Sequence, residues 1–353
     1  MNIYFIKFES NYHYVRLIIK GLKQKGVIVR KTTYPSPMSS FSIAVNGGVF
    51  HINWPEFYYK MGKGLIKMLV SIMLALSLII SMMIMRFLFG IRVVFSLHNL
   101  LPHNSERRWL DRIVYSAVIF CSSSVICHCI KARELINEHY PTYSGKVIVI
   151  PHPNFMGVYG DKMNKYEMRD ILNLPQDVYI YIFFGKVRAY KGIKELVKEF
   201  REVGGTEDRL LIVGSDDGTG YIEEIKRIAG DDKRIMIRGI WVLDEFVNLY
   251  MSCADCLVLP YRDILTSGGV LLSAQYCIPL VAPAIGCIPE QVDGRMAVIY
   301  DEGGLGDALR RIKGLKEREV IEGSRAVMER TALDVVTNRL IEDVYGGGEE
   351  LSC

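Results

Sequence analysis

The 353-residue sequence lacks several patterns that would assign it to well-known classes of protein. Its eight cysteines are scattered without the spacing of a disulfide framework, and the one CxxC motif, Cys253 to Cys256, has no second pair to form a zinc site. No GxGxxG motif opens either half of the chain, which disfavours a Rossmann dehydrogenase. Residues 1–8 read as a first strand that runs into polar residues, so we expect no signal peptide and a cytoplasmic protein.

Positive charge is concentrated in the first part of the chain. Residues 1–165 contain 20 Lys and Arg against 7 Asp and Glu, whereas the remainder contains 23 against 32. A basic domain usually binds nucleic acid or an anionic membrane surface. Because aromatic residues are not interleaved with the basic ones as in nucleic-acid motifs, the sequence favours a membrane surface and no nucleic-acid partner.

Residues 68–85 form an apolar stretch of 18 residues without a charge, long enough to cross a membrane. Strand-like runs on both sides argue against a single crossing, because they would place strands of one sheet on opposite sides of the bilayer. We therefore expect a helix that lies in the membrane interface. A buried helix of an α/β domain and a true span remain as alternatives. The basic residues that flank the stretch are Lys60, Lys63, Lys67, Arg86 and Arg92.

Short apolar runs alternate with stretches long enough for helices, which predicts parallel strands with crossover helices. The first series is Ile3–Ile6, Val27–Val29, Ile43–Val45, Val93–Leu97, Ser124–Cys127 and Val147–Ile150. The second series is Tyr179–Phe184, Leu210–Val213, Ile235–Ile237, Cys256–Leu259, Leu280–Ala282 and Ala297–Tyr300. The sequence therefore predicts two doubly wound, Rossmann-like α/β domains, residues 1–160 and 161–335, that face each other across a cleft. Residues 336–353 are expected to form a C-terminal helix and tail.

Two loops of the second domain contain groups that bind phosphate. Residues 185–192 carry Lys186, Arg188 and Lys191 between two glycines, which let the backbone approach a ligand closely. The turn Thr266-Ser267-Gly268-Gly269 precedes a predicted helix, whose free N–H groups attract anions. Taken alone, residues 185–192 could equally be an ordinary solvated loop, and the turn could be an ordinary helix cap. Together they predict a diphosphate site.

The order of several motifs resembles the GT-B glycosyltransferases of the large retaining family 4. The second domain contains FFGKVRAYKGI, RIMIRGIWVLDEFVNLYMSCADCLVLPYRDILTSGG and IPLVAPAIGCIPEQV, and the first contains VVFSLHNLLPHNS, SSSVICHCIKARELI and VIVIPHPNF. The resemblance spans nearly the whole chain. It implies a GT-B fold in which a nucleotide sugar binds mainly to the second domain and the acceptor to the first.

The resemblance assigns roles to individual residues. Lys191 matches the lysine that binds the donor diphosphate, while Lys186 occupies the position of the family's arginine and Arg188 lies close by. Thr266 to Gly269 match the turn that meets phosphate and sugar. Arg238, Gly239 and Trp241 lie in the segment that receives the base, and His98 matches a histidine facing the donor sugar across the cleft. We take His98, Arg188 and Lys191 as the candidate catalytic residues; His128 and His152 read as structural.

The sequence departs from the family pattern in two places. Two glutamates eight positions apart are replaced, one by Ile264 or Leu265 and the other by Leu272 or Ser273. Asp263 is the candidate substitute, with a surface pair to Arg262 as the alternative. The first loop has Ser10-Asn11-Tyr12-His13 in place of a glycine-rich turn, which indicates a different acceptor or phosphate contact. The candidate acceptor-binding residues are Asn11, Tyr12, His13 and His103.

The resemblance and the membrane-facing helix together imply an enzyme of glycan biosynthesis. We expect a peripheral glycosyltransferase at the cytoplasmic face of the membrane, moving a sugar from a nucleotide-diphosphate sugar to a lipid-linked saccharide or glycolipid with retention. No metal or other cofactor is expected. The alternatives are a protein that binds a nucleotide sugar without transferring it, and another GT-B enzyme such as a nucleotide-sugar epimerase.

Overall fold

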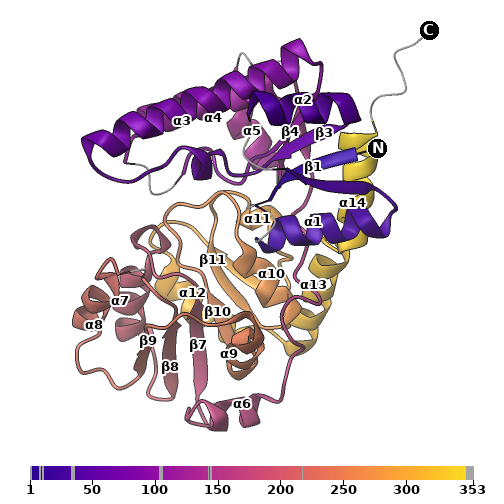
Figure 1. Ribbon diagram of the computed structural model, residues 1–353. Coiled ribbons are helices and arrows are strands. Elements are labelled where there is room, and N and C mark those ends of the chain that lie inside the picture. The colour runs from indigo at the N-terminus through magenta and orange to yellow at the C-terminus, as the bar shows by residue number, and fades with distance from the viewer. Residues whose placement is uncertain are drawn as a thin grey trace. The chain divides into compact units, whose positions relative to one another are not determined.

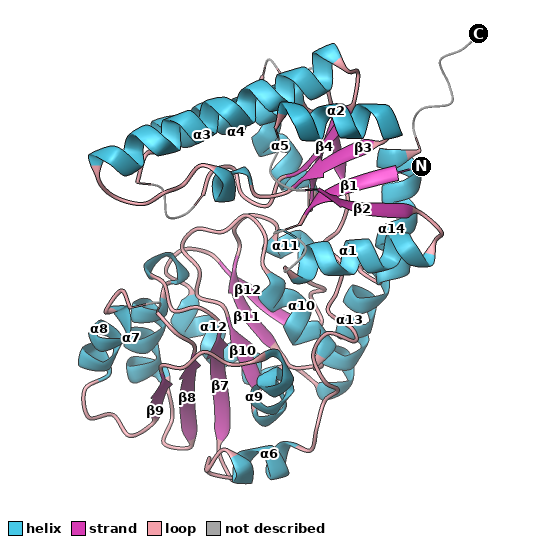
Figure 2. Cartoon of the chain, in the orientation of Figure 1, coloured by secondary structure: helices cyan, strands magenta, loops and turns pink. Residues whose placement is uncertain are grey.

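The computed structural model describes residues 2–346, apart from residues 8, 10–11, 33–35, 103–105, 142, 144 and 217. The chain forms two compact units: residues 1–153 together with the segment from Leu333, and residues 154–332. Each unit contains one six-stranded parallel sheet flanked by helices (Figure 2). The predicted fold class, two doubly wound α/β domains, is confirmed. The C-terminal segment belongs to the first unit.

The sheet of the first unit has the strand order β2-β1-β3-β4-β5-β6, so the order reverses between β1 and β3. Its strands are β1 Asn2–Ile6, β2 Ile28–Thr32, β3 Val49–Ile52, β4 Arg92–Ser96, β5 Ser124–Cys127 and β6 Lys146–Val149. Its helices are α1 His13–Gln24, α2 Pro37–Asn46, α3 Leu65–Met83, α4 Arg108–Cys121, α5 Ile130–His139 and α14 Leu333–Arg339.

One predicted strand of the first unit is wrong. Ile43–Val45 lies in α2, and the strand is β3, whose four residues are all buried. The side chain of Ser36 caps α2 by accepting from the N–H of Ser39 at 3.2 Å, and the proline that follows the cap favours helix. Gly47 and Gly48 then adopt positive φ angles, 62° and 154°, which end the helix before β3.

The C-terminal segment completes the core of the first unit. Helix α14, yellow in Figure 1, lies beside the indigo α1. Val336, Leu340 and Val344 are buried in one cluster with apolar side chains of α1 and the sheet. The Arg92 guanidinium donates to the carbonyls of Val344 at 2.6 Å and Tyr345 at 2.9 Å. These contacts fix the segment against one face of the first sheet.

Helix α3 is apolar on two faces. It connects the neighbouring parallel strands β3 and β4 and packs against α4. A buried stripe at helical spacing is formed by Ser71, Ala75, Leu78 and Met82, and by Met85 of the π-helical turn Ile84–Leu88 that continues the helix. The outer face carries exposed apolar side chains: Leu65, Ile66, Leu69, Met73, Leu76, Ile80 and Met83 of α3, and Phe87 and Leu88 of the turn. By length and composition, the helical stretch Leu65–Leu88 could cross a membrane, but a third of its most apolar window is buried in the protein.

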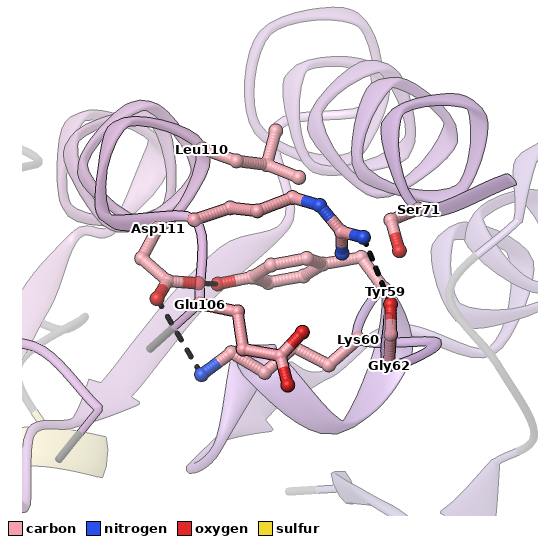
Figure 3. Close-up of a pocket in the computed structure, with 8 residues that line it drawn as sticks. Tyr59, Lys60, Gly62, Ser71, Glu106, Leu110 and Asp111 are labelled. Carbon is pink, nitrogen blue, oxygen red and sulfur yellow. Dashed lines mark hydrogen bonds and ion pairs between the residues drawn. The ribbon is translucent and has the colours of Figure 1, made fainter. Parts of the chain in front are cut away.

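Polar contacts around a pocket of about 110 Å³ hold the start of α3 in place (Figure 3). The Tyr59 hydroxyl donates to the buried carboxylate of Asp111 on α4, and Lys60 Nζ lies 3.4 Å from the other carboxylate oxygen. Arg107 donates to the carbonyl of Gly62 at 2.8 Å. Lys60 therefore serves the fold, because its removal would leave Asp111 buried without its cation.

The sheet of the second unit has the order β12-β11-β10-β7-β8-β9 and reverses between β10 and β7. Its strands are β7 Tyr179–Phe184, β8 Asp208–Val213, β9 Ile235–Arg238, β10 Cys256–Val258, β11 Leu280–Pro283 and β12 Ala297–Tyr300. Its helices are α6 Lys165–Ile171, α7 Ile193–Val203, α8 Tyr221–Ala229, α9 Val247–Cys253, α10 Gly268–Gln275, α11 Ile288–Gln291, α12 Leu305–Arg311 and α13 Glu317–Arg330.

Candidate functional site

Two loops of the second unit meet where its strand order reverses. β7 and β10 are neighbouring parallel strands, and the loops that follow them are residues 185–192 and 259–267. In open α/β sheets, ligands bind outside the carboxyl ends of the strands at such a reversal. The basic loop and the Thr-Ser-Gly-Gly turn therefore lie at the expected place for a ligand in this fold.

The backbones of the two loops are joined. The N–H of Arg262 donates to the carbonyl of Tyr190 at 2.9 Å. Gly192 has a φ of 66°, and a Cβ at this position would stand 1.8 Å from the carbonyl oxygen of Pro260. Only glycine satisfies both conditions. Glycine at position 192 therefore allows the two loops to lie in contact.

Lys191 is a partly buried cation between the two loops. Its ammonium lies over the rings of Phe183 and Tyr261, at 5.7 and 5.5 Å from their centroids. Among the described residues, no carboxylate lies within ion-pair distance of it. Burial, together with the charges of Lys186 and Arg188, lowers the pKa of Lys191 to about 8. Such a cation is costly without a counter-ion, and an anionic ligand would supply one.

Ser267 caps α10 and also lies near Tyr261. Its hydroxyl accepts from the N–H of Gly269 at 3.2 Å and lies 3.4 Å from the Tyr261 hydroxyl. Its own N–H donates to the side chain of Gln291 at 3.3 Å. Because Tyr261 touches both Lys191 and Ser267, the structure brings the basic loop and the helix terminus to one place.

The glycines of the turn also have a packing role. A Cβ on Gly268 would stand 3.1 Å from the ring of Phe155, and one on Gly269 would stand 2.9 Å from both methyl groups of Leu259. Thr266, half-buried, immediately precedes the cap residue. Close packing therefore explains these glycines without a ligand, and their predicted contact with phosphate stays a prediction.

The charged residues around this site differ in their surroundings. Lys186 is exposed, with its ammonium 5.6 Å from the ring centroid of Trp241, and Arg188 is half-buried at the start of the turn that carries Lys191. Arg262 forms an ion pair with Glu195, so its expected alternative partner, the exposed Asp263, is not needed to neutralise it.

The segment predicted to receive the base lies at the end of β9. The side chain of Arg238 donates to the carbonyl of Leu172 and lies 5.8 Å from the ring centroid of Tyr250, so it supports the fold. A Cβ on Gly239 would stand 2.9 Å from Ile222. Trp241 is 63% exposed. Of these residues, Trp241 alone presents a large apolar surface on which a base could stack.

In the first unit, His98 belongs to a cluster of rings at the carboxyl ends of β4 and β5. Its ring is stacked on Trp54, with centroids 4.6 Å apart, and meets the edge of Tyr14 at the same distance. His98 Nδ1 lies 3.2 Å from Nε2 of His128, whose Nδ1 donates to the carbonyl of Ile150 at 2.9 Å. Burial holds the pKa of His98 well below its usual range, so the ring is neutral at pH 7.

The loop after β1 contains a buried carboxylate that sequence reasoning missed. Glu9 is fully buried and accepts from the N–H groups of Asn53 and Trp54 at 3.0 and 3.2 Å. The Asn53 amide donates to it at 2.8 Å and the Tyr58 hydroxyl at 3.0 Å. Burial raises the pKa of Glu9, which these donors oppose. An acidic residue three positions after a predicted strand was the one available signal.

The residues expected to bind the acceptor are only partly described. Tyr12 is stacked on Phe57, with centroids 5.4 Å apart, and lies 4.7 Å from the ring of Trp54. His13 is the first residue of α1. Asn11 and His103 lie outside the described residues. The role of all four in acceptor binding stays a prediction.

Within the described ranges, no group of three or more His, Cys, Asp or Glu side chains is placed to hold a metal ion. The expectation that the protein needs no metal and no cofactor stays a prediction. Cations and helix N–H groups, rather than a carboxylate cluster, surround the predicted diphosphate site.

Known proteins resemble the chain in sequence and in fold. Residues 179–313 match the family model of glycosyl transferases group 1. A GDP-mannose:glycolipid 4-beta-D-mannosyltransferase of Xanthomonas campestris pv. campestris is 26% identical over 239 residues, which cover 67% of this chain and 61% of that relative. The match thus spans about three fifths of the relative's length.

Solved structures match over nearly the whole chain. Sucrose-phosphate synthase from Thermosynechococcus elongatus matches with a TM-score of 0.74 at 17% identity. The match covers 98% of this chain and 99% of the synthase chain. Anabaena HepE in complex with UDP has a TM-score of 0.72 at 12% identity, covering 98% and 100%. The family match and the sequence relatives support a glycosyltransferase, and the solved structures share the GT-B fold with this chain over nearly its whole length.

Proposed function

We propose that the protein transfers a sugar from a nucleotide-diphosphate sugar to a lipid-linked saccharide or glycolipid at the cytoplasmic face of an anionic membrane. The part of this proposal that concerns the sugar donor rests on Lys191. This residue is a partly buried cation without an ion pair among the described residues, and it lies beside the capped start of α10. Such a site fits a diphosphate, which offers several charged oxygens to one pair of loops.

The donor class is supported by the relatives. The sequence relatives are named for GDP-mannose, and HepE was solved with UDP and with UDP-glucose. Since the described site residues offer the base one exposed aromatic ring, Trp241, both guanosine and uridine donors are candidates. GDP-mannose is the first to test.

The chemistry follows from charge placement. As the bond between the sugar and the diphosphate breaks, Lys191, the neighbouring cations and the helix N–H groups stabilise the charge that develops on the leaving oxygen. Retention of configuration stays a prediction. The relatives' name specifies a β-linked product, so the anomeric configuration of the product, read by NMR against that of the donor, is the decisive measurement.

The part of the proposal that concerns the acceptor rests on the first unit. Its helix α3 exposes an apolar face, and residues 57–105 contain five Lys and Arg but no Asp or Glu. An apolar face with the exposed Lys63 and Lys67 at the start of its helix fits the surface of an anionic bilayer, where a lipid-linked sugar is found. The relatives are named for a glycolipid acceptor.

Donor binding is tested by thermal unfolding with a panel of GDP- and UDP-sugars. A ligand at 100 times its Kd adds about 2.7 kcal/mol of stability, which raises Tm by several degrees in a chain of this size. We expect GDP-mannose to give a shift that Lys191→Met greatly reduces. A donor that binds and is neither transferred nor hydrolysed would favour the binding-protein alternative, and conversion to an epimer would favour the epimerase.

Diphosphate affinity should weaken as the pH rises through 8. The pKa of Lys191 in the free protein is about 8, so the ammonium is present below that pH and is lost above it. If the bound anion needs the ammonium, Kd for GDP or UDP should be about tenfold weaker at pH 9 than at pH 7.5. Calorimetry on Lys191→Met, which has no proton to lose there, should show a flat profile; an equal slope would contradict the assignment.

A further inference from the structure

Helices α3 and α4 begin at the same end of the first sheet. They follow the neighbouring parallel strands β3 and β4, and right-handed crossovers place both helices on one face of the sheet, running back from the carboxyl ends of the strands. Figure 1 shows the two helices side by side. The ion pair of Lys60 with Asp111 and the hydrogen bond of Arg107 with Gly62 join their starts. The two helices therefore present one continuous face to solvent.

Positive charge gathers where α3 and α4 begin. Residues 57–121 contain eight Lys and Arg, of which six lie just before these helices or within their first five residues: Lys60, Lys63, Lys67, Arg107, Arg108 and Arg112. Of the two acidic residues in this segment, Glu106 is exposed, whereas Asp111 is buried and paired with Lys60. Trp109 and Ile113 are exposed next to the two arginines of α4. Cations beside an exposed Trp ring are typical of the head-group level of a membrane.

The other end of the same face is apolar. Phe87 of the turn that ends α3 and Phe120 near the end of α4 are both exposed, and their ring centroids lie 5.6 Å apart. Further exposed apolar side chains lie on this turn and on α2, which contacts it: Leu88, Phe41 and Val45. Arg86 and Arg92 are half-buried, and Arg92 donates to carbonyls of the C-terminal segment. The face therefore changes from cationic to apolar along the two helices.

We propose that this α3–α4 face docks on an anionic bilayer in one orientation, with the starts of both helices among the lipid head groups and their ends among the acyl chains. The inference deepens the proposed function, on which it rests for the bilayer as partner. Lys and Arg side chains stay with anionic head groups, whereas exposed Phe and Leu side chains gain free energy by leaving water. This orientation holds the carboxyl ends of the first sheet, where the loops predicted to bind the acceptor lie, near the head group of a lipid-linked acceptor.

The fluorescence of Trp109 measures its depth in the bilayer. In the full chain with Trp54→Phe and Trp241→Phe, Trp109 is the one remaining tryptophan. The vesicles contain phosphatidylserine and phosphatidylcholine, with a quencher either on the head group (a nitroxide) or on the acyl chains (bromine). We expect the head-group quencher to act about twofold or more strongly on Trp109. When Trp109→Phe and Phe120→Trp move the reporter to the other end of the face, the acyl-chain quencher should act more strongly.

Three results of this experiment would overturn the proposal. The first is the same order of quenching for both reporters, and the second is no quenching of either. The third is a shift of Trp109 emission that grows with protein concentration in the absence of vesicles, because a second copy of the chain would then cover the face.

The arginines of α4 give an independent test in the otherwise wild-type chain. Arg108→Ala with Arg112→Ala should weaken binding to phosphatidylserine vesicles by about tenfold or more and leave binding to neutral vesicles unchanged. The matched control is Arg16→Ala with Lys20→Ala, two exposed cations at the same spacing on α1, which covers the opposite face of the sheet (Figure 1). This control should bind within about threefold of the wild type.

Equal losses in the two double variants would contradict docking through the start of α4. The binding measurements are also separate from the proposed function. Absence of sugar transfer by the wild type would refute that function, whereas vesicle binding and quenching would still decide whether the face docks and in which orientation.

Discussion

Lys191→Met should lower kcat/KM for sugar transfer by about 10²–10³-fold. The methionine keeps the length and apolar contacts of the side chain but removes the ammonium that lies over Phe183 and Tyr261. Charge placed where a leaving group develops negative charge is among the largest contributions to catalysis, and losing one such donor costs this much in well-studied enzymes. Initial rates with GDP-mannose and a lipid-linked acceptor give the measurement.

Stability separates this effect from a folding defect. Lys191 has no ion pair among the described residues, so removing its charge relieves a cost in the free protein. The Tm of Lys191→Met without ligand should equal or exceed that of the wild type at pH 7. The matched control is Lys198→Met on α7, whose exposed charge lies outside both loops and is screened by solvent, so it should affect rates by about threefold or less. Transfer by Lys191→Met at a near wild-type rate would remove Lys191 from the site.

The second unit was largely predictable because its signals are local. Most strands are short buried apolar runs, and the cations of residues 185–192 follow one strand directly. The contact between the two loops could be expected because β7 and β10 are neighbours in this fold. The hydrogen bond of the Arg238 side chain could not be expected, because its partner, the carbonyl of Leu172, lies 66 positions away in the sequence.

The first unit was harder to predict because its candidate site is assembled from distant residues. Glu9, Asn53, His98 and His128 come from four different loops, and no spacing in the sequence relates them. Strand β3 was missed for another reason. It is four residues long and contains His51, which the fold accommodates by hydrogen bonds to Tyr345 at 2.5 Å and Ser96 at 2.8 Å. A strand that contains a buried polar residue is hard to predict, because the sequence does not show which groups will form hydrogen bonds with that residue.

Membrane docking through α3 gives the second large expected effect. Leu76→Glu combined with Ile80→Glu should weaken binding to anionic vesicles by about 10²–10³-fold, because each apolar side chain contributes about 1.5–3 kcal/mol when fully buried and each glutamate adds repulsion. The two side chains are 54% and 52% exposed, so the fold should tolerate the change. Vesicle sedimentation measures the binding, and donor affinity should stay unchanged.

The matched control places the same change on the second unit. Met156→Glu with Ile171→Glu removes two apolar side chains that are 66% and 60% exposed and adds the same charge. If α3 is the docking face, this control should bind vesicles within about threefold of the wild type. Equal loss in both double variants would indicate a general charge effect, and retention by both would refute docking through α3.

The basic residues contribute separately, and the structure decides which of them can be removed. Lys60 is the wrong target because it neutralises the buried Asp111. Lys63→Ala with Lys67→Ala removes two exposed charges, one just before α3 and one in its first turn, each worth about 1 kcal/mol near an anionic surface. Binding should therefore fall about tenfold or more on vesicles containing phosphatidylserine and stay unchanged on neutral ones. Loss on neutral vesicles would mean that these residues act through the fold, since lipid charge is absent there.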